Sequence, residues 1–300
     1  MITILTPTYN RAYILHKAYE SLVRQTSHDF EWIIIDDGSN DNTEELVLSW
    51  VAEQHQFPII FSKQENGGKH RAVNNGVKLA KSDYVLILDS DDYLTNDAVQ
   101  KIHQWISQTA HIEDICGVVG FRGFEDGKPL GNALDNEYID ITSLERIKYK
   151  ITADKAEVYK TKILKEFPFP EFEGENFIRE SSSWDRIASA GYKLRYYSDV
   201  IYICEYINDG LTKNTTSKTY AKNFQGFLYC TKLYLKNYSL SKRLNKIGEF
   251  LEVAKIKKIS LSKSAELLEI KKSALIIGNI YYKMRQFLKK TLIKTHLIRG

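Results

Sequence analysis

The 300-residue chain has few cysteines, few prolines and no long apolar run. Its three cysteines, Cys116, Cys204 and Cys230, are odd in number and far apart, which argues against a disulfide framework and a cysteine zinc site and predicts reduced thiols. No stretch reaches about 18 uncharged apolar residues, so we expect no transmembrane helix. The chain begins directly with a strand-like segment rather than a secretory leader. These features predict a cytoplasmic protein.

The net charge of +4 hides an asymmetry along the chain. Acids outnumber bases up to residue 110, whereas Glu266 and Glu269 are the only acids after residue 254, in a tail rich in lysine. Such a basic helical tail suits an anionic membrane surface, a solvated face packed on the rest of the protein, or a contact in a homo-oligomer. Nucleic acid is a weaker partner, because no recognised binding motif accompanies the charge. We therefore expect no nucleic acid, and a peripheral position at the inner face of the cell membrane is one of the three interpretations that stay open.

The first 110 residues alternate short β-branched apolar runs with helical patterns. This alternation predicts βαβ units, and hence an α/β fold with a mostly parallel, Rossmann-like sheet flanked by helices. The carboxyl ends of successive parallel strands then lie on one edge of the sheet. The expected strands are 2–6, 32–36, 58–62 and 84–88, and the expected helices are 13–25, 42–53 and 69–80.

The remainder of the chain is less regular up to residue 212 and helical beyond it. We expect one domain over 1–212, with halves 1–110 and 111–212, followed by a basic helical region over 213–300. No proline follows Pro170 to interrupt these helices. Expected in the second half are strands at 117–124, 156–159, 194–197 and 200–205, an extended segment at 167–175, a helix at 180–190 ending at Gly191, and a turn at 209–212.

The apolar strand at 84–88 breaks directly into Asp89, Ser90, Asp91 and Asp92. Three carboxylates within four residues repel one another, and a divalent cation with oxygen ligands would relieve that repulsion. The alternative is an acidic turn in which Asp91 or Asp92 caps the following helix. The four residues alone leave both interpretations open.

Three further polar clusters follow predicted strands or begin a helix. The first runs from Thr6 to Arg11, where Tyr9 could stack on a planar ring or pack against the next helix. The second is Asp36-Asp37-Gly38-Ser39, where Ser39 or Asp41 could cap the next helix. In the third, Gly67 and Gly68 precede Lys69 and Arg71, which could bind a phosphate or belong to a flexible solvated loop.

Taken in order, these clusters and their spacing resemble glycosyltransferase family 2, whose members are inverting, nucleotide-sugar-dependent enzymes with the GT-A fold. The resemblance is strong over residues 1–110 and weaker over 111–210. It implies that the donor-binding residues are Pro7, Tyr9, Arg11, Asp37, Lys69, Arg71, Asp89 and Ser90. Pro7 to Tyr9 would lie beside the base, and Asp37 would bind the uracil edge of a uridine nucleotide.

The family's D-x-D region is similar to Asp89-Ser90-Asp91, with Asp92 as an additional acid. The resemblance implies that Asp89, Asp91 and Asp92 are the candidate ligands of Mn²⁺ or Mg²⁺ on the donor diphosphate. Which carboxylate binds the metal stays open.

The family also implies an acid that takes the proton from the acceptor hydroxyl, six residues before an arginine. Glu180 and Arg186 match that spacing, although the usual Asp is a Glu here and Arg179 replaces the preceding acid. Asp185 is the rival base, with a surface or intrahelical partner as the alternative. Glu180 could instead be a helix N-terminal acid, and Trp184 either lines the acceptor side or is a core tryptophan.

The sequence therefore predicts a metal-dependent glycosyltransferase that moves a sugar, a hexose or N-acetylhexosamine, from a UDP-sugar to a carbohydrate or lipid-linked saccharide in bacterial polysaccharide biosynthesis. One rival is a nucleotidyltransferase, which would need a Gly-rich loop after the first strand, where this chain has Pro7, Thr8 and Tyr9. The other rival is a non-catalytic module on the same fold that binds sugar nucleotide or lipid.

Overall fold

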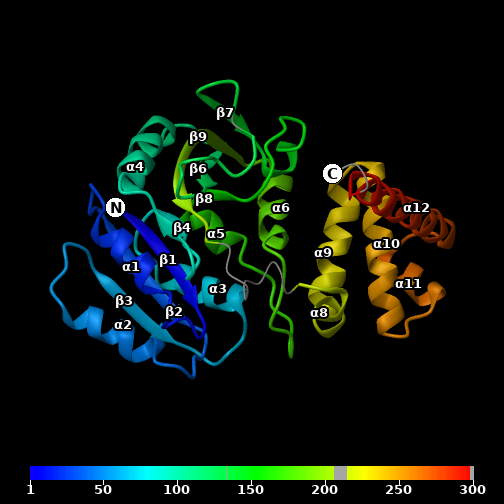
Figure 1. Ribbon diagram of the computed structural model, residues 1–300, viewed down its shortest axis with the longest axis horizontal. Coiled ribbons are helices and arrows are strands. Elements are labelled where there is room, and N and C mark those ends of the chain that lie inside the picture. The colour runs from blue at the N-terminus through cyan, green and yellow to red at the C-terminus, as the bar shows by residue number, and fades with distance from the viewer. Residues whose placement is uncertain (133, 206–214, 298–300) are drawn as a thin grey trace. The chain divides into compact units, whose positions relative to one another are not determined.

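The computed structural model describes residues 1–132, 134–205 and 215–297. The chain divides into two compact units, Met1–Glu171 with Ser183–Gly210, and Phe172–Ser182 with Leu211–Gly300. The turn predicted at 209–212 and the predicted boundary after residue 212 lie outside the described residues. Figure 1 shows the elements of both units along the chain.

The first unit is an α/β structure built on one sheet, which confirms the predicted fold class (Figure 1). Its strands are β1 (Ile2–Thr8), β2 (Phe30–Asp36), β3 (Ile59–Lys63), β4 (Tyr84–Ile87), β5 (Tyr93–Leu94), β6 (Ile115–Gly123), β7 (Tyr138–Ile141), β8 (Lys155–Lys160) and β9 (Lys193–Ile203). Its helices are α1 (His16–Val23), α2 (Thr43–Ala52), α3 (Lys69–Leu79), α4 (Ala98–Thr109) and α5 (Thr161–Glu166), with the short 3-10 helix η1 (Ser143–Glu145). Helix α6 (Ser181–Ser189) begins in the segment of the second unit and continues into the first.

The strand order is β3-β2-β1-β4-β8-β6-β9-β5, with β7 paired to β9. Strands β3, β2, β1 and β4 are mutually parallel, and β4 then pairs with β8 in the antiparallel sense. Because Thr8 at the end of β1 pairs with Asp36 at the end of β2, the segments that leave these strands start at the same edge of the sheet. This edge carries the acidic segments after β2 and β4.

Both faces of the parallel strands are covered, which explains their continuous apolar sequence. Every residue of β1 and β2 is buried. One face packs Ile4 and Trp32 against α1, α2 and α4 in the main core. On the other face Gly76 of α3 lies directly against Leu5, where a Cβ would collide with the leucine side chain.

The second half of the first unit departs from the prediction at its last strand. One strand, β9 (Lys193–Ile203), replaces the two predicted at 194–197 and 200–205. Val119 pairs with Tyr196 whereas Phe121 pairs with Val200, so an irregularity in the pairing absorbs extra residues of β9 without ending the strand. The predicted left-handed glycine after α6 is confirmed, since Gly191 has a φ of 91°. Elements α4, α5, β5 and β7 fall where no element was predicted.

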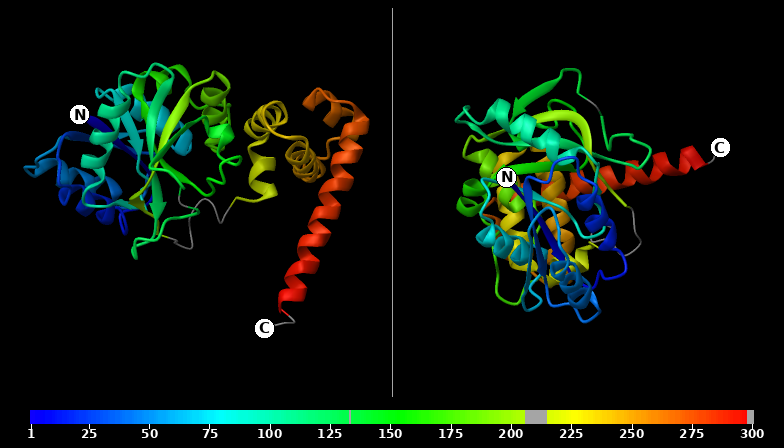
Figure 2. Two further views of the ribbon diagram at one scale, coloured as in Figure 1. Left: turned by 90° about the horizontal axis from the view of Figure 1, so that it is seen from above. Right: turned by 90° about the vertical axis from the view of Figure 1, so that its left-hand side faces the viewer.

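The second unit is helical, as the tail sequence predicted, and Figure 2 shows its helices from two further directions. Its core gathers aromatic and aliphatic side chains such as Phe227, Phe250 and Leu275. None of the helices in the described residues is long and apolar enough to cross a membrane. Its helices are α8 (Ser217–Lys222), α9 (Phe224–Asn237), α10 (Leu240–Ile256), α11 (Leu261–Leu268) and α12 (Lys272–Leu297).

The segment Phe172–Ser182 and the start of α9 are connected by hydrogen bonds in which each accepts from the backbone of the other. Asn223 Oδ1 accepts from the backbone N–H groups of Asn176 (2.9 Å) and Phe177 (3.0 Å). In return the Glu175 carboxylate accepts from the first N–H groups of α9, at Gln225 (2.6 Å) and Gly226 (2.8 Å). These bonds satisfy donors that a helix N-terminus leaves unpaired, so the segment and α9 form one structure.

Candidate functional site

The acids after β4 form a turn whose backbone is fixed to the sheet. The Leu88 N–H donates to Leu5 O (2.9 Å), and the Asp89 N–H donates to the hydroxyl of the fully buried Tyr202 (2.9 Å). The Asp92 N–H then closes the turn onto Asp89 O (3.1 Å). Asp97, and neither Asp91 nor Asp92, occupies the N-cap position of α4. The capping interpretation of this turn is therefore wrong.

Asp89 is paired with two cations. Its Oδ1 lies 2.5 Å from Lys69 Nζ, and its Oδ2 lies 3.2 Å from Arg122 Nη1. Burial alone would raise the pKa of the Asp89 carboxyl, but the charges of Lys69 and Arg122 outweigh it and hold the pKa well below its usual range. Asp89 is therefore ionised at every physiological pH.

Arg122 of β6 is a site residue that the sequence interpretation missed. Its Nη1 also lies 3.6 Å from Asp92 Oδ2, and its Nε–H donates to Lys155 O (3.1 Å). Its guanidinium stands 4.2 Å from the ring centroid of Tyr202. One signal was present in the sequence, because Arg122 is the only charged residue in the otherwise apolar strand Ile115–Gly123.

The pKa values of Asp91 and Asp92 are raised, whereas that of Asp89 is lowered. Burial and the neighbouring Asp89 charge raise the pKa of the Asp92 carboxyl to about 7, while its Oδ1 accepts from the Glu205 N–H (2.9 Å). The same two causes raise the pKa of Asp91. Asp91 forms no ion pair with any residue that the structure describes. It is the carboxylate of this turn with most capacity for an added cation.

Asp37, after β2, is held by the loop that begins α3. Its two carboxylate oxygens accept from Gln64 Nε2 (2.7 Å), the Gly67 N–H (2.9 Å) and the Gly68 N–H (2.8 Å), with Asn66 Nδ2 at 3.3 Å. The side chain is 4% exposed. Gly68 has a φ of 95°, which a residue with a Cβ rarely adopts. A nucleobase could bond to Asp37 only by replacing one of these donors.

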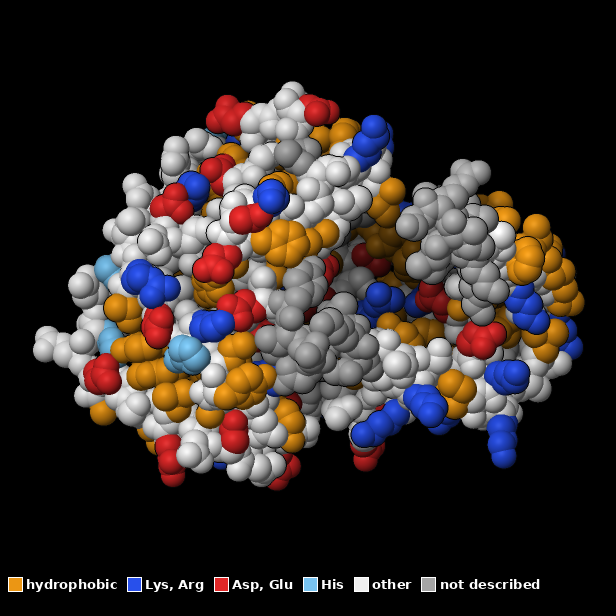
Figure 3. Space-filling model, in the orientation of Figure 1, with side chains coloured by type: hydrophobic (Ala, Val, Ile, Leu, Met, Phe, Trp, Pro, Cys, Tyr) orange, Lys and Arg blue, Asp and Glu red, His pale blue; other side chains and the backbone are white. Residues whose placement is uncertain are grey.

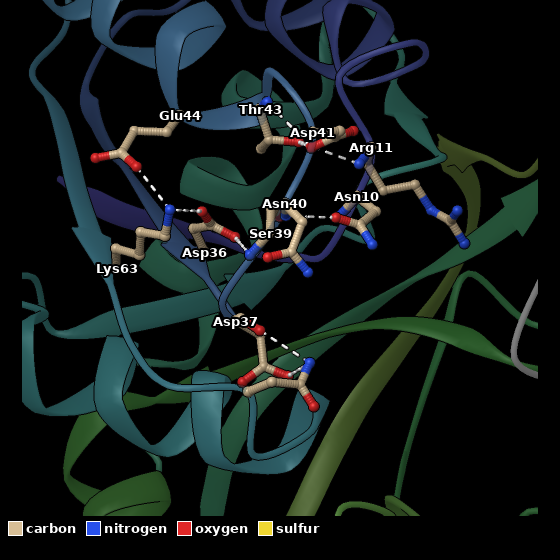
Figure 4. A network of polar contacts seen from close by, with 11 residues as sticks. Asn10, Arg11, Asp36, Asp37, Ser39, Asn40, Asp41, Thr43, Glu44 and Lys63 are labelled. Carbon is tan, nitrogen blue, oxygen red and sulfur yellow. Dashed lines mark hydrogen bonds and ion pairs between the residues drawn. The ribbon is translucent and has the colours of Figure 1, made fainter.

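Hydrogen bonds connect the turn after β1 with residues 39–43 at the start of α2, next to Asp36 (Figure 4). Asp36 Oδ1 accepts from the Ser39 N–H (2.9 Å), and its Oδ2 lies 3.8 Å from Lys63 Nζ. The Ser39 hydroxyl accepts from the Asn10 N–H (2.8 Å) instead of capping α2. Asp41 Oδ1 accepts from the Thr43 N–H (3.1 Å), but the N-cap position of α2 is Asn42, so neither Ser39 nor Asp41 is the cap residue that the sequence predicted.

The segment between β1 and α1 has two exposed aromatics, Tyr9 and Tyr13. Tyr9 is 43% exposed, which leaves much of its side chain accessible to a ligand, whereas Pro7 is buried inside β1. The Arg11 N–H donates to Thr43 Oγ1 (3.2 Å), and its guanidinium lies beside Tyr13. Pro7 thus belongs to the framework, and Tyr9 and Arg11 belong to the surface.

The glycine pair before α3 is hydrogen-bonded to Asp37, and the two basic side chains that follow are ion-paired instead of solvated. Arg71 covers Gly67 with its Cδ and pairs with Glu171 through Nη1 (2.5 Å). Glu171 also accepts from Asn74 Nδ2 (2.7 Å). Of the two predicted phosphate ligands, Lys69 therefore lies at Asp89 and Arg71 lies at Glu171.

The predicted acceptor-side residues are in different surroundings. Trp184 stacks on Tyr159 with ring centroids 4.6 Å apart and meets the edge of Phe169 at 5.3 Å, as the core alternative expects. Asp185 is 5% exposed, so it is not a surface acid. Glu180 directly precedes α6, is exposed, and belongs to the segment Phe172–Ser182 of the second unit. Its predicted role as base remains a prediction.

No group of three or more His, Cys, Asp or Glu side chains in the described residues forms a preassembled metal centre. The residues that the first unit brings together are Lys69, Asp89, Arg122 and Asp92, next to Asp91. Such a set can fix the position of one carboxylate and leave another for a cation shared with a phosphate ligand.

Comparison with known proteins gives one family. The sequence pattern described as Glycosyl transferase family 2 matches residues 3–167. Glycosyltransferase GlyG of Streptococcus pneumoniae is 31% identical over 109 residues, which cover 36% of each chain. Poly(ribitol-phosphate) beta-N-acetylglucosaminyltransferase TarP of Staphylococcus aureus is 31% identical over 171 residues, 52% of this chain and 51% of TarP. The matches to these curated relatives thus span a third to a half of the relatives' length.

Two solved structures share the fold over nearly the whole chain. S. aureus TarS 1–349 in complex with UDP-GlcNAc superposes with a TM-score of 0.60 at 18% identity, covering 94% of this chain and 89% of that one. Mannosyltransferase PcManGT from Pyrobaculum calidifontis, in complex with GDP-Man and Mn²⁺, gives 0.55 at 15% identity, covering 94% and 86%. At these identities the likeness establishes the fold.

Proposed function

Because the chain belongs to glycosyl transferase family 2, we propose that it transfers a sugar from a UDP-sugar to an acceptor hydroxyl, with inversion at the anomeric carbon, in the assembly of a bacterial surface polysaccharide. The observation that carries this proposal is the turn Asp89–Asp92 with its two cations, Lys69 and Arg122, at the carboxyl edge of a parallel sheet. Ligands bind at this edge in open α/β sheets. We propose that residues 1–212 form the catalytic domain.

The relatives support the donor class. TarP is named as an N-acetylglucosaminyltransferase that acts on poly(ribitol-phosphate), and TarS has been solved with UDP-GlcNAc. A hexose or N-acetylhexosamine carried by UDP is therefore our first candidate donor. A saccharide or polyol polymer, free or lipid-linked, is our first candidate acceptor.

The residues of the turn fit a divalent metal, Mn²⁺ or Mg²⁺, shared with the donor. Asp91 forms no ion pair with a described residue, and burial and the Asp89 charge raise its pKa although Arg11 and Lys69 act in the opposite direction, so an added cation would stabilise its charged form. Mg²⁺ commonly takes one or two carboxylates and completes its shell with phosphate oxygens and water, so a preassembled cage is not required. When bound, the metal neutralises charge on the leaving diphosphate. Lys69 and Arg122 fix the position of Asp89, which with Asp91 would hold the metal, and the mannosyltransferase with the same fold was solved with Mn²⁺.

We assign the proton transfer to Glu180. The acceptor oxygen forms the new bond to the anomeric carbon, the bond from that carbon to the diphosphate breaks, and the acceptor proton passes to the Glu180 carboxylate. Glu180 is exposed, as an acid that must meet an incoming hydroxyl requires. The buried Asp185 has less access to an acceptor.

Thermal stability in the presence of nucleotide sugars tests donor and metal together. A UDP-sugar at a hundred times its dissociation constant should stabilise the protein by about 2.7 kcal/mol, and more with Mn²⁺ than with EDTA. GDP-mannose serves as the control nucleotide. If no nucleotide sugar raises the melting temperature in the presence of metal, the proposed function is wrong.

Glu180→Gln tests the base. Donor binding should be unchanged and transfer should fall at least a hundredfold, the usual range for a lost general base being about 10²–10⁴. Glu173→Gln, an exposed acid of the same segment, is the matched control and should transfer normally. Normal transfer by Glu180→Gln together with loss in Asp185→Asn would reassign the base to Asp185.

A further inference from the structure

Helix α12 packs on the second unit through one narrow face. Leu275 is fully buried, and Gly278 and Tyr282 lie against Ile247 and Gly248 of α10. These three residues of α12 are three and four positions apart, so they share one side of the helix. The remaining faces of α12 are available to another partner.

A second apolar face of α12 is exposed. Its large side chains are 49–69% exposed and recur three or four residues apart. They are Ile276, Ile277, Ile280, Met284, Phe287 and Leu288, which we call the α12 stripe. Figure 3 shows hydrophobic side chains gathered where Figure 1 places α12, with Lys and Arg side chains beside them. An isolated exposed apolar residue is ordinary, but six at helical spacing indicate a contact surface.

The charges that border the α12 stripe have one sign. Lys272 and Lys283, eleven positions and about three turns apart, lie along one edge. Arg285 lies along the other edge, next to Leu288. The sequence of α12 contains no Asp or Glu. The partner must therefore offer an apolar layer next to negative charge.

We propose that the α12 stripe binds the surface of an anionic lipid bilayer, with its apolar side chains at the boundary of headgroups and acyl chains and its lysines and arginine at the lipid phosphates. An apolar stripe edged by Lys and Arg is the pattern of helices that lie in this interface. A second copy of α12 would bring positive charge against positive charge, which disfavours the homodimer as the occupant. The proposal is independent of the proposed function.

Sedimentation with lipid vesicles tests this proposal on the full chain. The protein should bind vesicles of 30% phosphatidylglycerol in phosphatidylcholine, and at least about tenfold more weakly to pure phosphatidylcholine, given the contribution of each basic residue near an anionic surface. Raising the salt concentration should weaken the binding. Absent binding to anionic vesicles, or equal binding to both kinds, would overturn the proposal.

Two double variants separate the apolar and the charged parts. Ile280→Asn with Phe287→Asn should lower vesicle binding roughly a hundredfold, because it removes two large apolar side chains from the stripe. Lys283→Gln with Arg285→Gln should lower it roughly tenfold. The matched controls are Leu240→Asn, at a 70% exposed leucine of α10, and Lys128→Gln, at an exposed lysine of the first unit, and both should bind as wild type.

Light scattering of the same samples tests whether a second copy of the chain, instead of lipid, binds the α12 stripe. A monomer whose vesicle binding is lost in the apolar variant, at unchanged melting temperature, supports the lipid surface. A dimer that the apolar variant converts to a monomer, with equal vesicle binding before and after, would assign the stripe to a second copy and refute the proposal.

Discussion

Two acidic segments leave parallel strands on either side of β1, one after β2 and one after β4, and their carboxylates are neutralised in different ways. Asp37 is held by two backbone N–H groups and two side-chain amides of residues 64–68. Asp89 is held by the charged ends of Lys69 and Arg122. Backbone and side-chain amides that bond to a carboxylate fix the path of their loop. Long cationic side chains can instead leave the carboxylate and bind a phosphate while the backbone keeps its fold.

The difference assigns distinct tasks to the two segments. The segment after β2 is a framework whose acid makes the Gly67-Gly68 turn possible. The segment after β4 carries excess negative charge, since Asp91 and Asp92 both have raised pKa values. Ligand chemistry should therefore be sensitive to the acids after β4, and folding should be sensitive to the acid after β2.

The largest expected effect is that of Asp91→Asn on transfer. Removing the carboxylate that we assign to the metal should lower the transfer rate at least about a thousandfold, because Lewis-acid stabilisation of the leaving group is worth several kcal/mol. The melting temperature without ligand should stay the same, and the extra stabilisation by Mn²⁺ with UDP-sugar should disappear. A transfer rate near that of wild type would show that ligand chemistry does not depend on the carboxylate of Asp91, contrary to the task that we assign to the segment after β4.

The next largest effect is that of Asp37→Asn on stability. Asparagine keeps one acceptor oxygen, so one of the glycine N–H groups would face an amide group, and the free energy of unfolding should fall by about 3 kcal/mol. Urea unfolding at pH 7 measures this change. Asp83→Asn, at an exposed acid before β4, is the control and should change stability by less than about 0.5 kcal/mol. A similarly small loss in Asp37→Asn would show that the loop does not need its carboxylate.

The strands of the first 110 residues, apart from β5, and the position of both acidic segments followed from the sequence, because buried parallel strands are short apolar runs and their ends are marked by polar residues. Pairing between distant residues did not follow. Arg122 meets Asp89 across 33 residues of sequence, and only the placement of β8 between β4 and β6 brings them together. The bonds of Asp37 to residues 64–68 depend likewise on a loop path that no local pattern specifies.

The same limit applies to the segment that carries Glu180. Pro168 and Pro170, just before it, predicted an extended connection over residues 167–175, and the structure has no helix or strand there. What the local sequence could not indicate is that Asn223 and Glu175, 48 residues apart, attach this connection to α9. Contacts of this kind need the tertiary arrangement of helices, which short-range periodicity does not contain.

A smaller effect concerns His70, which follows the glycine turn in α3 and is 6% exposed. Burial lowers its pKa from 6.5 to about 4, so the folded protein binds fewer protons than the unfolded chain between these values. Stability should therefore fall as the pH falls from 6.5 towards 4, by about 2 kcal/mol from this residue. Urea unfolding of His70→Gln across this range should show a weaker pH dependence than wild type. His103→Gln is the control, and equal slopes for wild type and His70→Gln would contradict the prediction.

The smallest expected effect tests whether charge or shape holds the segment after β4. Arg122→Lys keeps a cation near Asp89 but loses the Nε–H bond to Lys155 O and the guanidinium plane against Tyr202. We expect the free energy of unfolding to fall by about 1 kcal/mol. If the charge of Arg122 provides most of the stabilisation, Arg122→Gln should lower the free energy of unfolding more than Arg122→Lys does. In 1 M NaCl the difference in stability between the two variants should become smaller. An equal decrease in the free energy of unfolding in the two variants would mean that hydrogen-bond geometry holds this segment, as it holds the one after β2. The two segments would then differ only in Asp91, which forms no ion pair with a described residue.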